Sequence, residues 1–229
     1  MILTVTLNAA LDVTYDVDRL TPHTTHRVSA VAERAGGKGI NVARLLHALG
    51  EPVTATGLVG GHTGERIVDL LGADGVPAEF SEIAAESRRT VVVRSDGDAT
   101  GFWEPGPAVT AAEWSRFTER FRQLLTYVHV VVLSGSLPGG PDGAGSVPTE
   151  VYGQLVNAAR VAAVPVVLDA DGEPLRHGLA ARPTVVKPNA DELAAVIGHR
   201  PETTAETADA ARRLHRESGS AVVASLGAD

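Results

Sequence analysis

The feature that most constrains how this chain folds is a glycine-rich segment that opens directly into an amphipathic helix. Residues 35–44 read AGGKGINVAR. Val42, Leu46 and Leu49 follow the i, i+4, i+7 spacing of a helix with one buried face. Gly50 then ends the helix, because glycine is common just past a last turn. The segment predicts a tight turn followed by a helix that packs on a core through Val42, Leu46 and Leu49.

The start of this helix is a candidate anion site. A helix N-terminus is electropositive because its first N–H groups lack partners and its dipole adds to them. The glycines remove side chains that would keep a ligand away from the backbone. Lys38 adds a positive charge, and Asn41 offers both a donor and an acceptor. A tight turn with a solvated Lys38 fits the same residues, so local sequence leaves both interpretations open.

Composition and charge exclude several classes of protein. The chain has 229 residues, 44% of them apolar and 21% charged, which is enough for one large domain or two small ones. Its net charge of −8 argues against nonspecific nucleic-acid binding. No apolar run approaches the ~18 residues of a membrane span, and residues 1–7 lack the features of a signal peptide. Because there is no cysteine, disulfides and thiolate metal sites are excluded. We expect a cytoplasmic protein that binds neither nucleic acid nor membranes.

Strand and helix patterns alternate along the chain. The later strands are near-continuous runs of Val, Leu and Ala, which predicts a parallel sheet with helices on both faces. Residues 12–31 contain a half-exposed strand, and 91–94 with 100–104 predict a hairpin. The other expected strands are 2–7, 53–59, 128–133, 165–168, 184–186 and 221–225, and the other expected helices are 63–72, one behind a capping box at 110–113, 149–163, one from about 190, and 204–219.

Polar and glycine-rich residues follow most of the expected strands. In open α/β sheets, ligands bind beyond the carboxyl ends of the strands, so these loops are candidates for the rim of an active site. They are residues 8–12, 134–139, 169–172, 187–192 and 225–227. The chain lacks a P-loop, a dinucleotide-binding glycine motif, a histidine metal motif and a nucleophile elbow.

Six short motifs, in order along nearly the whole chain, carry a family resemblance. They are TLNAALD at 6–12, GGKGINVA at 36–43, EPGP at 104–107, LSGSLP at 133–138, VKPN at 186–189 with Glu192, and VASLG at 223–227. Together they resemble the phosphofructokinase B family of sugar kinases, in particular the subgroup of 1-phosphofructokinase and tagatose-6-phosphate kinase. The resemblance implies one α/β ribokinase-like domain over residues 1–229, a three-layer α/β/α sandwich with a mainly parallel sheet. A small β-lid would be formed by about 12–34 and 88–104.

The implied reaction is transfer of the γ-phosphoryl group of ATP, with Mg²⁺, to a ketose phosphate. The subgroup favours fructose 1-phosphate, which would become fructose 1,6-bisphosphate. Tagatose 6-phosphate and fructose 6-phosphate remain alternatives. Because lids in this family often pair between subunits, we also expect a homodimer through the lid.

By position in these motifs, six residues would bind the sugar phosphate. Asp12 would accept hydrogen bonds from sugar hydroxyls, and Arg88 would bind the existing phosphate, which suits a guanidinium fork. The alternatives are a strand-end turn for Asp12, a solvated Arg88-Arg89 pair, and ordinary turn chemistry for Ser136. The full set implied by the resemblance is Asp12, Gly37, Lys38, Asn41, Arg88 and Ser136.

Residues near the end of the chain would bind the nucleotide. The resemblance assigns Lys187, Asn189, Ser225 and Gly227 to ATP, and Asn189 with Glu192 to Mg²⁺. Asn189 and Glu192 also have the spacing of a capping box, and both roles can coexist.

The sequence departs from the family pattern at four places, one of which is a loop at 139–148 that is longer than usual. Ala9 stands where proline is usual, and residues 169–172 read DADG where Asp-Thr/Ser-Ser is usual. The sequence stops at Asp229, before the Gly-Ala-Gly-Asp segment that supplies the family's aspartate base. Asp169 and Asp171 follow another strand, so we expect neither to replace it, and we assign no catalytic residue. Two hypotheses follow: a partial sequence of an active kinase, or a truncated, non-catalytic sugar-phosphate-binding protein or pseudoenzyme.

Overall fold

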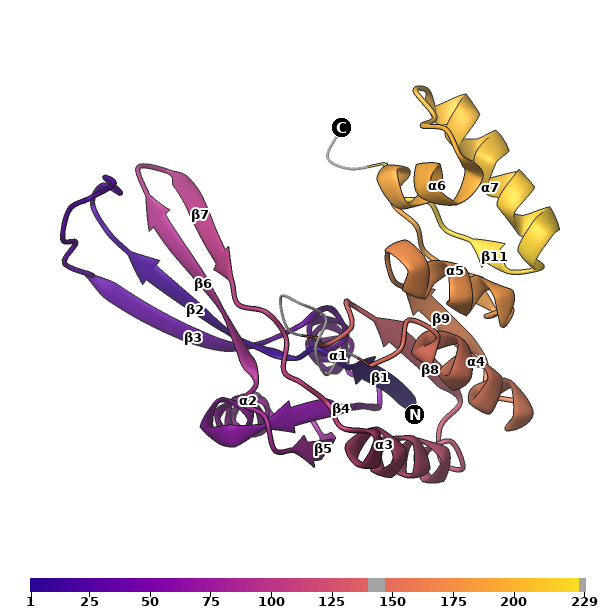
Figure 1. The fold of residues 1–229 in the computed structure, drawn as a ribbon, viewed down its shortest axis with the longest axis horizontal. Helices are drawn as coiled ribbons and strands as arrows, with labels where there is room; N and C mark the ends of the chain where they lie inside the picture. Colours follow the sequence, from indigo (N-terminus) through magenta and orange to yellow (C-terminus); the bar gives the residue numbers. More distant parts are fainter. Residues whose placement is uncertain (140–146, 227–229) are drawn as a thin grey trace.

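Seven parallel strands form the main sheet of the protein. The computed structural model describes residues 1–139 and 147–226 (Figure 1). The strand order is β11-β10-β9-β8-β1-β4-β5, and every neighbouring pair is parallel. The strands are β1 (Ile2–Thr6), β4 (Val53–Gly60), β5 (Ala78–Ile83), β8 (Val130–Ser134), β9 (Val166–Asp169), β10 (Val185–Val186) and β11 (Ala221–Val222).

Helices cover both faces of this sheet and make it the middle layer of a sandwich. Leu58 of β4 belongs to the apolar cluster under α3 and α4, whereas Val53 and Ala55 belong to the cluster under α1 and α2. This division follows from the alternation of side chains along a strand. The helices are α1 (Lys38–Ala48), α2 (Gly61–Ala73), α3 (Ala111–Leu124), α4 (Val151–Val161), α5 (Gly172–Ala180), α6 (Ala190–Ile197) and α7 (Thr204–Ser218). This is the three-layer α/β/α sandwich that the family resemblance implied.

A second, four-stranded sheet projects from the main body (Figure 1). Its order is β3-β2-β6-β7, with β2 parallel to β6 and the outer pairs antiparallel. The strands are β2 (Ala10–Asp16), β3 (Ala30–Gly36), β6 (Arg88–Ser95) and β7 (Asp98–Trp103). The segments from which we expected a lid therefore form one sheet, which includes the expected hairpin. Its action as a lid stays a prediction.

The buried face of α1 differs from the expected one. Leu49 is 69% exposed and Leu46 only partly buried, whereas Gly39, Ile40 and Ala43 are buried. A Cβ atom on Gly39 would lie 2.6 Å from the carbonyl oxygen of Val5 in β1. The helix thus approaches the sheet through its smallest residues. Of the residues expected to be buried, Leu46 packs against the apolar cluster, whereas Leu49 does not.

Three elements were not expected from the sequence, and one is shorter than expected. Strand β3 continues through Ala35 and Gly36, where a turn was expected, because it pairs with β2 as far as Ala10. Edge strand β5 has the polar sequence AEFSEI, since edge strands carry charged residues rather than continuous apolar runs. Helix α5 begins Gly-Glu-Pro, which reads as a loop although proline is tolerated in a first turn. Strand β11 ends at Val222, and Ser225 forms only an isolated bridge with Asn189.

Among the residues that the structure describes, no helix has the length and apolar character needed to cross a membrane. The cytoplasmic location stays a prediction.

Candidate functional site

A cavity of about 920 Å³ lies between the carboxyl end of the main sheet and one face of the four-stranded sheet. We call it the inter-sheet cavity. It is lined by Thr6, Asn8, Asp12, Thr14, Ala32, Glu33, Arg34, Gly37, Lys38, Asn41, Arg88, Thr90, Val92, Trp103, Glu104, Pro105, Gly106, Gly135, Ser136 and Asp171. All six residues predicted to bind a sugar phosphate are in this set, although they come from four separate segments. Their individual roles stay predictions.

The N-terminus of α1 forms part of the cavity wall. Gly37 precedes the helix with φ 114°, no side chain caps its first turn, and that turn has no acidic residue. A Cβ atom on Gly37 would lie 2.6 Å from Thr6 Cγ2, so both the backbone conformation and the space require glycine. The first amide N–H groups of α1, which no side chain caps, can therefore donate hydrogen bonds to an anion beside Lys38 and Asn41.

Asp12 lies on the cavity face of the four-stranded sheet. The strand register places Asp12 opposite Arg34 of β3 and Thr90 of β6. Burial raises the pKa of the Asp12 carboxyl, and it outweighs the lowering by Arg34 and by a hydrogen bond with Thr90. A Cβ atom on Gly36 would lie 2.2 Å from Asp12 Oδ2, so the carboxylate lies directly against the Gly36 backbone. The result is a half-buried carboxylate held in the cavity wall.

Arg88 is a half-buried cation in the same wall. Its Nε donates to the carbonyl oxygen of Asn8 at 3.4 Å, and its Nη1 donates to Thr90 Oγ1 at 3.3 Å. Burial lowers the pKa of Arg88, and nearby Asp12 and Glu104 oppose that shift. Within residues 1–139 and 147–226, Arg88 forms no ion pair, and its hydrogen bonds go to neutral oxygens. A half-buried guanidinium with neutral partners suits an anionic ligand.

The sequence motifs did not single out several residues that the structure brings into this wall. Asn8 donates from Nδ2 to Ser136 Oγ at 3.1 Å, which joins the loop after β1 to the loop after β8. Arg34 and Trp103 enter the cavity from β3 and β7. Asp171, whose loop we expected at the rim of the site but which we did not expect to act as a base, also lines the cavity. Only the pairing of Arg34 with Asp12 could have been found by aligning strands.

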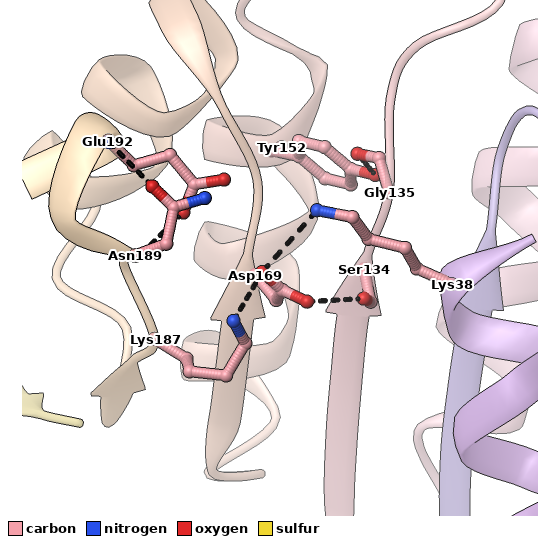
Figure 2. A network of polar contacts seen from close by, with 8 residues as sticks. All are labelled: Lys38, Ser134, Gly135, Tyr152, Asp169, Lys187, Asn189 and Glu192. Atoms are coloured by element: carbon pink, nitrogen blue, oxygen red, sulfur yellow. Dashed lines mark hydrogen bonds and ion pairs between the residues drawn. The ribbon is translucent and has the colours of Figure 1, made fainter. Parts of the chain in front are cut away.

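A second group of polar residues lies at the carboxyl ends of β8 and β9 (Figure 2). Asp169 accepts a hydrogen bond from Ser134 Oγ at 3.0 Å, and it pairs with Lys187 at 3.2 Å and Lys38 at 3.7 Å. We call these four residues the Asp169 cluster. Beside it, the buried Tyr152 hydroxyl donates to the Gly135 carbonyl oxygen at 2.8 Å. Burial raises the pKa of Tyr152, which keeps this donor protonated.

Asn189 and Glu192 form the capping box of α6 (Figure 2). The Glu192 amide donates to Asn189 Oδ1 and the Asn189 amide donates to Glu192 Oε2, both at 2.8 Å. Ser225 lies beside them, since its amide donates to the Pro188 carbonyl oxygen at 3.1 Å. Gly227 lies outside the described residues. The structure thus brings Asn189, Glu192 and Ser225 together outside the inter-sheet cavity, and their nucleotide and metal roles stay predictions.

The capping box still leaves a ligand for a divalent cation. Glu192 Oε1 accepts no hydrogen bond in the part of the chain that the structure describes, so one carboxylate oxygen is available. No group of three or more His, Cys, Asp or Glu side chains among the described residues could hold a metal ion. A single carboxylate fits a cation held mainly by water and phosphate oxygens, as Mg²⁺ often is.

Comparisons with known proteins agree with this architecture. Residues 5–229 match the model of the pfkB family of carbohydrate kinases. Phosphofructokinase-2 from Escherichia coli, in a tetrameric inhibited form, is 32% identical with a TM-score of 0.89; the match covers 99% of this chain and 73% of that chain. Its complex with fructose-6-phosphate is 32% identical with a TM-score of 0.88 over 99% and 74% of the two chains.

Two further structures extend the comparison. A possible 1-phosphofructokinase from Thermotoga maritima is 31% identical, with a TM-score of 0.86 over 99% of this chain and 72% of that chain. Ribokinase from Arabidopsis thaliana, at 23% identity and a TM-score of 0.71 over 99% and 72%, shares the fold. The chain belongs to the pfkB family of carbohydrate kinases, whose reaction implies ATP and a divalent metal ion.

Proposed function

We propose that this protein transfers the γ-phosphoryl group of ATP to a ketose phosphate, and that fructose 1-phosphate is its preferred acceptor. The product would be fructose 1,6-bisphosphate. The observation that carries this proposal is the inter-sheet cavity, where the carboxylate of Asp12 lies in one wall with the guanidinium of Arg88 and the uncapped N-terminus of α1. A carboxylate for hydroxyl groups beside cations for a phosphate is the chemistry that a sugar phosphate requires.

In this proposal, the residues act mainly by positioning and by charge stabilisation, which dominate phosphoryl transfer. Asp12 accepts hydrogen bonds from sugar hydroxyls and fixes the orientation of the sugar. Arg88 binds the phosphate already present. Gly37, Lys38 and Asn41, with the first amides of α1, hold the sugar or its phosphate. The four-stranded sheet would cover the cavity and exclude water.

The choice of fructose 1-phosphate rests on resemblance. Lys38 in GGKG and the EPGP segment at 104–107 favour the 1-phosphofructokinase subgroup, and both line the cavity. Tagatose 6-phosphate and fructose 6-phosphate are the alternative acceptors, and the latter is the ligand named for one E. coli structure.

For the nucleotide, we propose that ATP binds near Lys187, Asn189, Ser225 and Gly227. Glu192 would contribute its available carboxylate oxygen to Mg²⁺, together with Asn189. When bound, the cation would neutralise phosphate charge on ATP. The role of Lys187 is supported by its ammonium group, which lies half-exposed beside Asp169.

We also propose a homodimer through the four-stranded sheet. Val31 and Phe102 lie on the face away from the cavity and are 60% and 56% exposed. The strand register places Val31 opposite Tyr15 and Phe102 opposite Val91, which makes this face apolar. Exposed apolar patches mark interaction sites. Light scattering of wild type and Phe102→Lys tests this, and an unchanged mass would contradict the proposal.

The experiment for the main proposal is a calorimetric titration of the 229-residue chain with fructose 1-phosphate, with an ATP turnover assay on the same sample. Fructose 6-phosphate and tagatose 6-phosphate are titrated in parallel. Binding with turnover supports the kinase and directs attention to Asp171 as a base from this chain. Binding without turnover indicates a sugar-phosphate-binding chain that lacks its base. A folded protein that binds none of the three contradicts the proposal.

A further inference from the structure

Asp169 is held at a fixed position between neighbouring strands. It ends β9, and the register places it opposite Ser134 of β8. Its side chain is only 14% exposed, and its Oδ2 accepts the hydrogen bond from Ser134 Oγ at 3.0 Å. A largely buried carboxylate anchored through one oxygen has its second oxygen in a defined place.

That second oxygen is shared by two lysines from different parts of the fold. Lys187, just after β10, brings Nζ to 3.2 Å from Asp169 Oδ1, and Lys38, the first residue of α1, brings Nζ to 3.7 Å from the same atom. Figure 2 shows the two side chains reaching Asp169 from opposite sides. Both lysines are partly exposed, at 50% for Lys38 and 39% for Lys187.

One negative charge cannot neutralise two ammonium groups, so the two lysines are energetically linked. If Lys187 turns to another anion or is removed, Asp169 interacts with Lys38 alone and holds it more strongly. Without Asp169, the two long side chains repel each other and lose their common anchor. The availability of Lys38 for a ligand in the inter-sheet cavity therefore depends on Lys187.

We infer that Asp169 is a positioning residue that couples Lys38 to Lys187, and through them couples the inter-sheet cavity to the region after β10. The identity of the two ligands, a sugar phosphate and ATP, rests on the proposed function. The coupling itself rests on the shared carboxylate oxygen.

A double-mutant cycle tests the coupling by the affinity for fructose 1-phosphate, measured by calorimetry. Lys187→Met is expected to weaken binding by about two- to fivefold in the presence of Asp169, because Asp169 then interacts with Lys38 alone. In the Asp169→Asn background, the same substitution is expected to have a clearly smaller effect. Equal effects of Lys187→Met in both backgrounds would overturn the inference, since they would show a simple additive charge effect.

A second cycle leaves Asp169 intact, in case Asp169→Asn does not fold. Lys187→Met is expected to weaken binding more in wild type than in Lys38→Met, where nothing remains to be coupled. An equal weakening contradicts the coupling. For Asp169→Asn in the first cycle, Asp209→Asn serves as the matched control, because it removes the same charge from the Arg212 ion pair on α7. It is expected to leave affinity unchanged.

A ligand-free measurement separates this inference from the proposed function. In carbon–proton NMR spectra, Lys187→Met is expected to shift the signal of the Lys38 methylene next to Nζ when Asp169 is present. The shift is expected to shrink in Asp169→Asn. Failure of wild type to bind fructose 1-phosphate would contradict the proposed function alone. A Lys38 signal that does not respond to Lys187→Met would contradict the coupling alone.

Discussion

The inter-sheet cavity and the capping box of α6 both contain residues that the family resemblance assigned to ligands, but they differ in how those residues are satisfied. In the cavity, the Arg88 guanidinium has only neutral partners among the described residues, and no side chain caps α1. At α6, Asn189 and Glu192 satisfy each other. Polar groups without strong partners indicate a site prepared for a ligand. Groups that hydrogen-bond to each other stabilise the fold, and only their remaining donor and acceptor atoms can bind a ligand.

The largest effect that tests this contrast is expected from Arg88→Ala. Because Arg88 would make charged hydrogen bonds to phosphate, its loss is expected to weaken fructose 1-phosphate binding by about ten- to a hundredfold. Free fructose is expected to be affected much less. The matched control is Arg89→Ala, since Arg89 lies next in the chain but pairs with Glu104 at 3.1 Å. Calorimetry decides: equal losses for phosphosugar and free sugar would refute the phosphate role of Arg88.

The second test is Gly36→Ala, which acts on Asp12 without changing its chemistry. The new Cβ atom would fall 2.2 Å from Asp12 Oδ2 and must displace the carboxylate. We expect about a tenfold loss of sugar-phosphate affinity, comparable to losing a charged hydrogen bond. Gly72→Ala is the control, because a Cβ atom there meets nothing within 4 Å. If both variants bind like wild type, the position of Asp12 does not matter for the ligand.

The third test is the pH dependence of binding. Asp12 must be ionised to accept hydrogen bonds from hydroxyls with both oxygens, and burial raises its pKa. We therefore expect affinity to fall on acidification at a higher pH than for an ordinary aspartate, near ~3.9. Because the raised pKa shows that the ligand-free fold disfavours the ionised carboxyl, the free energy of unfolding of the ligand-free protein is expected to fall as the pH rises through that pKa. Titrations of wild type and Asp12→Asn between pH 4 and about pH 8 check this, and an unchanged profile in Asp12→Asn would exclude Asp12 as its source.

The smallest effect is expected at the capping box. Asn189→Ala removes the cap of α6 and is expected to lower the free energy of unfolding by about 1 kcal/mol, measured by denaturant titration. Glu192→Ala is expected to weaken the Mg²⁺ dependence of ATP binding, while sugar-phosphate affinity stays as in wild type. A Mg²⁺ dependence that survives Glu192→Ala would leave this residue with a capping role only.

Much of this organisation could be predicted from local patterns. The capping boxes at Thr110 and Asn189 are confirmed, because they depend on two residues three positions apart. The buried strands were found because continuous apolar runs are typical of a parallel sheet. Helix α5 and strand β5 were missed because a Gly-Glu-Pro start and a polar edge strand resemble loops. The buried face of α1 was predicted only in part, because close packing on β1 selects Gly39 and Ala43 rather than Leu49, while Leu46 does pack on the core.

The family, the α/β alternation and most of the elements could be predicted from motifs and periodicity, because these are local patterns that need no knowledge of tertiary contacts. Which of these residues line the same site depends on the tertiary structure. Strand register placed Arg34 beside Asp12, the α5 start brought Asp171 into the cavity, and parallel β9 set Asp169 between Lys38 and Lys187. Such neighbours are far apart in the chain, and only the packing of strands and helices fixes the distances between their charges.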